Sequence, residues 1–127
     1  MIPEADIYSK IGNDGFTRVA KAFYRRVAVD DLLGPMYPAD DLAGSEQRLR
    51  SFLVYRFGGP STYIEQRGHP KLRARHLPFV IDEAARDRWV RLMTYAVSEV
   101  ELDRDVADTM RAFFEKTATF LINRPVV

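Results

Sequence analysis

Several features that mark particular classes of protein are missing from this sequence of 127 residues. It contains no cysteine, which excludes disulfide bonds, thiolate metal sites and iron–sulfur clusters. Residues 1–6 have neither the basic nor the apolar region of a secretory signal, and no apolar run approaches the ~18 residues needed to cross a membrane. We therefore expect a cytoplasmic protein without a membrane span.

An excess of charge of either sign is also missing. The 19 lysines and arginines nearly balance the 18 acidic residues, which leaves a formal net charge of +1. With 46% hydrophobic residues, this balance argues against a disordered chain and against a surface built throughout to bind nucleic acid. The length suits one domain, and we expect residues 1–127 to form it.

Apolar residues at helical spacing predict four long helices, and no segment shows the alternation expected of a strand. The helices are expected from Phe16, after a cap at Asn13 or Asp14, to about Asp30; from between Asp41 and Ser45 to Gly58; from the cap Asp82 to Val100; and from Asp103 or Asp105 to just before Pro125. The apolar side of the last helix includes Phe113, Phe114 and Phe120, which we expect to face the core. The fold class is therefore predicted to be all-α.

The connection between the second and third helices, residues 58–81, is unusually long. It holds three glycines, three prolines and both histidines of the chain, His69 and His76, and we expect at most a short helix after Pro70. Connections longer than about 12 to 15 residues are generally functional or disordered. Apolar residues such as Leu72 and Phe79 argue against disorder, so we ask what this segment is ordered around.

The residues alone leave more than one answer open. No acidic residue lies between Glu65 and Asp82, and the basic residues there are Arg67, His69, Lys71, Arg73, Arg75 and His76. They could form a solvated basic loop, an anion site, or a site in which one histidine binds a metal. Without cysteine or a His-x-x-x-His pair the chain cannot build a zinc site of its own, so a metal would arrive inside a macrocycle. Haem requires one protein ligand, an apolar slot and partners for its propionates.

A haem site would also explain three polar aromatic residues, Tyr24, Tyr37 and Trp89. Tyr24 falls one step from the apolar side of the first helix, Tyr37 follows that helix, and Trp89 lies on the apolar side of the third. If they are buried, their O–H and N–H groups need partners. Otherwise Trp89 is an ordinary core residue and both tyrosines lie at the rim.

The order and spacing of these residues resemble those of the group II truncated haemoglobins. Most of the resemblance lies in the segment Gly58-Gly59-Pro60-x-x-Tyr63-x-x-x-x-Gly68-His69-Pro70-x-Leu72-Arg73-x-Arg75-His76-x-Pro78-Phe79. Residues 23–27, residues 37–44 and Trp89 are also similar, so the resemblance runs from about Ile7 to Leu121. The chain departs at Gly12-Asn13, where the family usually has two glycines, and at Phe57, where tryptophan is common.

The resemblance implies a two-over-two helical sandwich around haem b. It makes His76 the metal ligand and His69 a structural residue. The distal side, which takes diatomic gases (O2, CO and NO), would be formed by Tyr24, Tyr37, Ser45 and Trp89. The remaining cofactor-binding residues would be Leu49, Phe52, Leu53 and Phe79 on the apolar wall, and Arg75 and Tyr63, with Arg73 or Lys71, near the propionates.

This interpretation predicts tight oxygen binding, with Trp89 and Tyr37 as the main hydrogen-bond donors and Tyr24 in support. The protein would then serve in oxygen transport, sensing or scavenging. It could also oxidise nitric oxide with bound dioxygen, helped by an unidentified reductase. Because no acid lies near His76 in sequence, we expect a backbone carbonyl to bind its second nitrogen and peroxidase activity to be weak. The alternative is a helical adaptor that binds RNA or anions through the basic loop without haem. Both the haem protein and the adaptor are compatible with a homo-oligomer.

Overall fold

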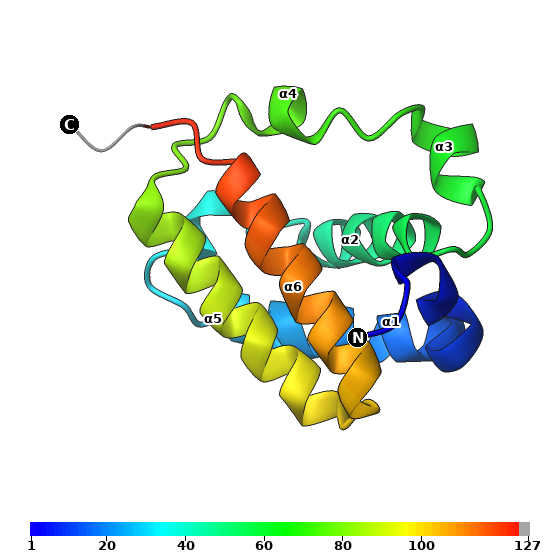
Figure 1. Ribbon diagram of the computed structural model, residues 1–127. Helices are drawn as coiled ribbons and strands as arrows, with labels where there is room; N and C mark the ends of the chain where they lie inside the picture. The colour runs from blue at the N-terminus through cyan, green and yellow to red at the C-terminus, as the bar shows by residue number, and fades with distance from the viewer. Residues whose placement is uncertain (125–127) are drawn as a thin grey trace.

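The computed structural model describes residues 1–124, which form helices joined by turns and loops, with no β-strand in that range (Figure 1). The four long helices are α1 (Ile7–Val27), α2 (Leu42–Arg56), α5 (Glu83–Val100) and α6 (Arg104–Phe120). The short ones are two 3-10 turns, η1 (Glu4–Asp6) and η2 (Gly34–Met36), and two helices, α3 (Thr62–Arg67) and α4 (Leu72–His76). The all-α prediction is confirmed.

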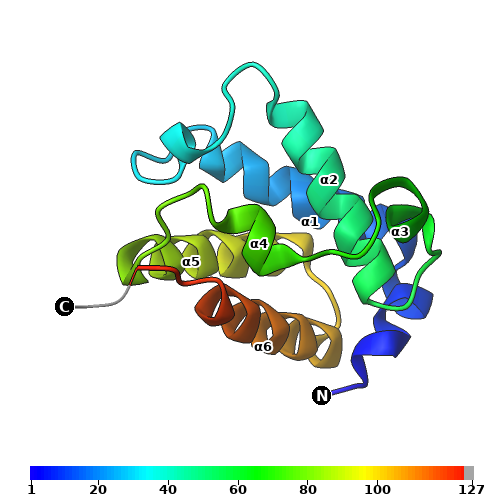
Figure 2. The same ribbon diagram turned by 90° about the horizontal axis from the view of Figure 1, so that it is seen from above.

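The long helices form two pairs. Helix α1 packs against α2 and against α5, and α5 packs against α6. Figure 2 shows α1 and α2 on one side and α5 and α6 on the other, with the segment that carries α4 drawn between the two pairs as it runs from α3 to the start of α5. This arrangement is a two-over-two helical sandwich.

Aromatic rings join the two pairs in one core. Phe57, at the end of α2, is fully buried and stacks on Phe16 of α1 with ring centroids 5.8 Å apart. It also meets Phe113 of α6 edge-on, with ring centroids 5.0 Å apart. Each such ring contributes about 1.5 to 3 kcal/mol on burial. Phe57 thus fills a central position in the packing between α1, α2 and α6.

The first helix begins earlier than predicted. Helix α1 starts at Ile7 and is broken at Gly12, where φ is +63°. The predicted start after Asn13 therefore describes only the second part of α1. The first part was not predicted because it has too few apolar residues to show a helical repeat. At its other end α1 stops at Val27, three residues before the predicted end at Asp30.

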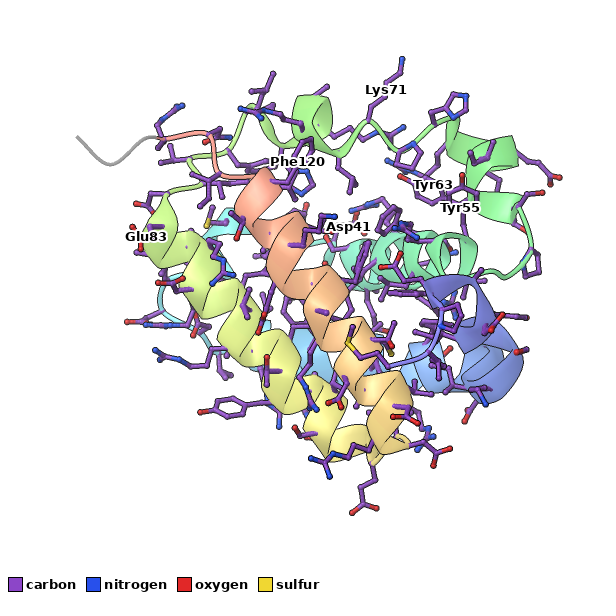
Figure 3. All side chains as sticks on the ribbon, viewed as in Figure 1. Asp41, Tyr55, Tyr63, Lys71, Glu83 and Phe120 are labelled. Carbon is purple, nitrogen blue, oxygen red and sulfur yellow. The ribbon has the colours of Figure 1, made fainter. Side chains whose placement is uncertain are left out.

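The connecting segments largely follow expectation, with one exception. Between α1 and α2 lies the short turn η2, and the predicted N-cap Asp82 accepts a hydrogen bond from the Ala85 N–H at 2.8 Å. Helix α4 is the short helix expected after Pro70, but α3 was not predicted. Six residues are too few to display a helical pattern of apolar residues; α3 is held because Tyr63 packs on Phe52 and Tyr55 of α2 (Figure 3).

The prediction that Phe120 faces the core is wrong. Its side chain is 56% exposed. The last turn of α6 approaches α4 rather than the helical core (Figure 3), and the Arg73 guanidinium lies 5.6 Å from the centre of the Phe120 ring. Pro125, the expected end of this helix, lies outside the described residues. Within residues 1–124, no helix is both long enough and apolar enough to span a membrane.

Candidate functional site

Three helical segments bring the polar aromatic residues together. Tyr24 comes from α1, Tyr37 follows η2, and Trp89 comes from α5. The Tyr24 and Tyr37 rings meet edge-on with centroids 5.4 Å apart, and Phe23 lies 5.1 Å from both Tyr24 and Trp89. Tyr24 is only 8% exposed, so it lies inside the protein and not at the rim.

The environment keeps both phenols protonated. Burial is the main cause that raises the pKa of Tyr24, and the neighbouring Tyr37 raises it further. Burial also raises the pKa of Tyr37, although hydrogen bonding with Trp89 and Tyr24 opposes this shift. Both hydroxyl groups therefore remain neutral donors across the physiological pH range. With the indole N–H, the cluster holds three hydrogen-bond donors.

Helix α2 contributes one polar and several apolar side chains. Ser45 is buried, and its hydroxyl accepts a hydrogen bond from the Arg48 guanidinium at 3.2 Å. Arg48 also contacts Asp41 at the start of α2, at 3.4 Å. Arg48 was not predicted, because no motif connects it with Ser45. Of the predicted apolar wall, Leu49 is half-buried, Phe52 is buried against Tyr63, and Leu53 lies fully within the core.

The two histidines occupy different environments. His69 is exposed in the turn between α3 and α4, whereas His76, the last residue of α4, is half-buried. The Nδ1 atom of His76 lies 2.6 Å from the carbonyl oxygen of Leu72, which confirms the expected backbone partner. A neutral ring that donates from Nδ1 keeps the lone pair of Nε2 for a metal.

The basic side chains around α4 differ in what they contact. Arg75 donates to the Arg67 carbonyl at 2.8 Å, and Gln66, Arg67 and Arg75 line a shallow, open hollow. Arg73 lies over Phe120, while Lys71 points away from the helices (Figure 3). Of the side chains expected near the propionates, Arg75 is half-buried and Tyr63 is buried.

These residues fit a haem group. His76 offers one ring nitrogen, and the ring of Phe79 lies 6.4 Å from the imidazole while remaining 43% exposed. Leu77 and Val80, in the same segment, are more than half exposed. Exposed apolar side chains grouped in this way usually mark a binding surface. A single imidazole, an apolar surface beside it and nearby arginines together match what a haem requires.

Comparisons with known proteins give the same assignment. Residues 6–123 match the model of the bacterial-like globin family. A group 2 truncated hemoglobin of Bacillus subtilis is 37% identical over 117 residues, which cover 92% of this chain and 88% of that protein. The two-on-two hemoglobin-3 of Arabidopsis thaliana is 33% identical over 124 residues, covering 95% and 71%.

Solved structures show the same similarity in three dimensions. A thermostable hemoglobin from the actinobacterium Thermobifida fusca is 42% identical, with a TM-score of 0.91 over 94% of this chain and 98% of that one. A truncated oxygen-avid haemoglobin from Bacillus subtilis is 37% identical, with a TM-score of 0.88 over 92% and 98%. Sequence and fold thus agree over almost the whole chain. It belongs to the bacterial-like globin family as a group II truncated haemoglobin, and this membership supports haem-based oxygen binding.

Proposed function

We propose that this protein binds haem b through His76 and retains dioxygen tightly beside Tyr24, Tyr37 and Trp89. The observation that carries the proposal is the meeting of these three side chains, from three separate segments, in one cluster in which Tyr24 is buried and Tyr37 and Trp89 are half-buried. The similarity to an oxygen-avid haemoglobin supports the same conclusion.

His76 is the proposed metal ligand. Its Nδ1 is engaged with Leu72, and therefore only Nε2 remains for coordination. The hydrogen bond also limits rotation of the ring about the Cβ–Cγ bond of the side chain. A ligand that is already oriented loses less conformational entropy when it binds.

The distal cluster is proposed to hold the gas molecule. Haem, when bound, supplies an iron centre that takes up dioxygen reversibly. Because dioxygen gains partial negative charge in such a site, we assign Trp89 and Tyr37 as its main donors and Tyr24 as the residue that orients Tyr37. Ser45 lies on the same side of α2 as Leu49, one turn away, and is proposed as an additional distal residue.

The remaining residues hold the cofactor itself. Leu49, Phe52, Leu53 and Phe79 are proposed as apolar contacts, although complete burial in the core makes Leu53 a support for the others. Arg75 and Tyr63 are proposed near the propionates, with Arg73 or Lys71. Arg75 also binds the Arg67 carbonyl, so the same guanidinium would stabilise the α3–α4 connection.

Tight retention makes a protein a poor oxygen carrier. Scavenging, sensing, or oxidation of nitric oxide by dioxygen suits it better, and the last of these requires a separate reductase as electron donor. Carbon monoxide and nitric oxide would bind at the same position as dioxygen.

The rate of oxygen release tests this proposal. Trp89→Phe removes one donor but keeps an aromatic ring, and release should become about tenfold faster or more, because a hydrogen bond to a charged group contributes about 1.5 to 3 kcal/mol. Tyr95→Phe is the matched control, because Tyr95 lies on the same helix with its side chain 54% exposed. Stopped-flow release rates that are equal in Trp89→Phe and the wild type would contradict the proposed distal role.

A further inference from the structure

Asn123, just beyond the end of α6, binds the segment that follows His76. Its side-chain Nδ2 donates to the His76 carbonyl at 3.2 Å and to the Phe79 carbonyl at 2.9 Å. Its Oδ1 accepts from the Ile81 N–H at 2.9 Å. The backbone N–H of Asn123 donates to the Ile81 carbonyl, also at 2.9 Å. One residue thus joins the end of α6 to both ends of residues 76–81.

The surroundings of Asn123 determine which way its amide points. An amide can donate two hydrogen bonds from nitrogen and accept at oxygen. In the observed orientation the nitrogen faces two carbonyls and the oxygen faces one N–H. The reverse orientation would set oxygen against two oxygens and nitrogen against a donor. The three partners therefore require an asparagine amide in this one orientation.

Helix α4 depends on such tethers because it packs weakly. The helix pairs in extensive contact are α1 with α2 and α5, α5 with α6, and α2 with α3; α4 belongs to none of them. A helix of five residues is not stable by itself in water. Arg75, in the last turn of α4, ties this helix to the end of α3 by donating to the Arg67 carbonyl. Asn123 ties the C-terminal end of α4 to the end of α6.

We propose that Asn123 is a positioning residue for the metal ligand. The inference rests on the proposed role of His76 and extends it. Leu72 fixes the imidazole relative to α4, and Asn123 fixes the main chain of His76 relative to α6. Together they set the direction in which Nε2 points. No sequence pattern indicated this role for an asparagine 47 residues from the histidine.

Asn123→Asp tests the inference with little change in side-chain shape. The carboxylate can still accept from the Ile81 N–H, but it loses both donors and faces two carbonyl oxygens. In haem-loaded protein, the ferrous iron–histidine stretching band measured by resonance Raman spectroscopy should shift or broaden. Haem transfer to excess apomyoglobin should become about tenfold faster, which corresponds to one or two hydrogen bonds. Asn13→Asp is the matched control, because Asn13 is the other asparagine of the chain and is exposed; it should behave as the wild type.

The outcomes separate this inference from the proposal on which it rests. An unchanged band and unchanged haem transfer in Asn123→Asp would overturn it, even if urea unfolding of the apoprotein showed lower stability, because a purely structural role predicts only the stability loss. If the carboxylate prevents folding, Asn123→Ala removes the donors without adding charge and is expected to give the same shift. A band that persists in His76→Gly would overturn both the role of Asn123 and the assignment of His76.

Discussion

The Nδ1 atom of His76 lies 2.6 Å from the carbonyl oxygen of Leu72, one turn earlier in α4. A backbone carbonyl is neutral, so it orients the imidazole without giving it the anionic character that a carboxylate partner would. The electronic character of the proposed metal ligand is therefore determined by a hydrogen bond within its own short helix.

This relationship predicts weak peroxidase activity. Peroxidases benefit from a proximal imidazole made more basic by a carboxylate, and His76 has a carbonyl instead. Oxidation of guaiacol by hydrogen peroxide, measured as an initial rate in haem-loaded protein, should be about 10- to 100-fold slower than in a plant peroxidase, since an outer-shell partner of a ligating histidine typically contributes that factor to activity. Comparable rates would show that the carbonyl does not limit this chemistry.

A second prediction concerns Asp30, which anchors the turn leading to Tyr37. Its carboxylate accepts hydrogen bonds from the Leu33 N–H at 2.8 Å, the Leu32 N–H at 3.1 Å and the Arg88 guanidinium at 2.8 Å. Asp30→Ala should lower the free energy of unfolding by about 1 to 2 kcal/mol, because two backbone donors lose their partner. Asp31→Ala is the control, since Asp31 contacts the same Arg88 with its side chain 91% exposed; its effect on urea unfolding should be close to zero. Equal effects of the two substitutions would contradict the assignment.

The contribution of Asp30 should also depend on pH. Burial raises the pKa of Asp30, but hydrogen bonds from Leu33, Arg88 and Leu32 outweigh this and hold it below its ordinary value. A lowered pKa in the folded state stabilises the protein above the ordinary carboxyl pKa of about 4, and this stabilisation is lost as the pH falls below that value. The difference in unfolding free energy between the wild type and Asp30→Ala should therefore shrink on acidification. A difference that grows below about pH 4 would reverse the sign of the predicted shift.

A third prediction compares two glycines with positive φ. Gly58 has φ +95°, and a Cβ there would lie 2.1 Å from the Ala5 carbonyl oxygen. Gly68 has φ +75°, but a Cβ there would meet nothing within 4 Å. Gly68→Ala should cost about 1 to 2 kcal/mol of backbone strain, and Gly58→Ala more than that because the N-terminal segment must also move. Thermal unfolding would measure both, and equal losses would show that the contact with Ala5 is unimportant.

The helices could be predicted where their apolar residues repeat over several turns. Helix α5 matched its predicted bounds because it has a capping aspartate and a long apolar side. Helix α3 did not, since six residues cannot display the repeat and Tyr63 is held only by contacts with α2. Phe120 continues the apolar repeat of α6 but leaves the core where its helix approaches α4, and a repeat carries no information on where a packing partner ends.

The candidate site was predictable where single residues carry its chemistry. Tyr24, Tyr37 and Trp89 stood out because polar aromatic residues need hydrogen-bond partners if they are buried. The choice between His69 and His76 came from the family resemblance, and their different burial agrees with it. Arg48 was not identified because no motif marks it, although helix geometry alone brings residues three apart, such as Ser45 and Arg48, together. Asn123 could not be found, because its backbone partners are brought near only by the fold.

The central claim, that His76 is the axial ligand of a haem, is tested most directly by absorption spectra of protein expressed with added haem. Spectra of the ferric, reduced and carbon monoxide forms would be compared for the wild type, His76→Ala and His69→Ala. We predict a strong Soret band that is retained in His69→Ala and shows altered ligation in His76→Ala. Wild-type protein without stoichiometric haem, or unchanged ligation in His76→Ala, would contradict the claim.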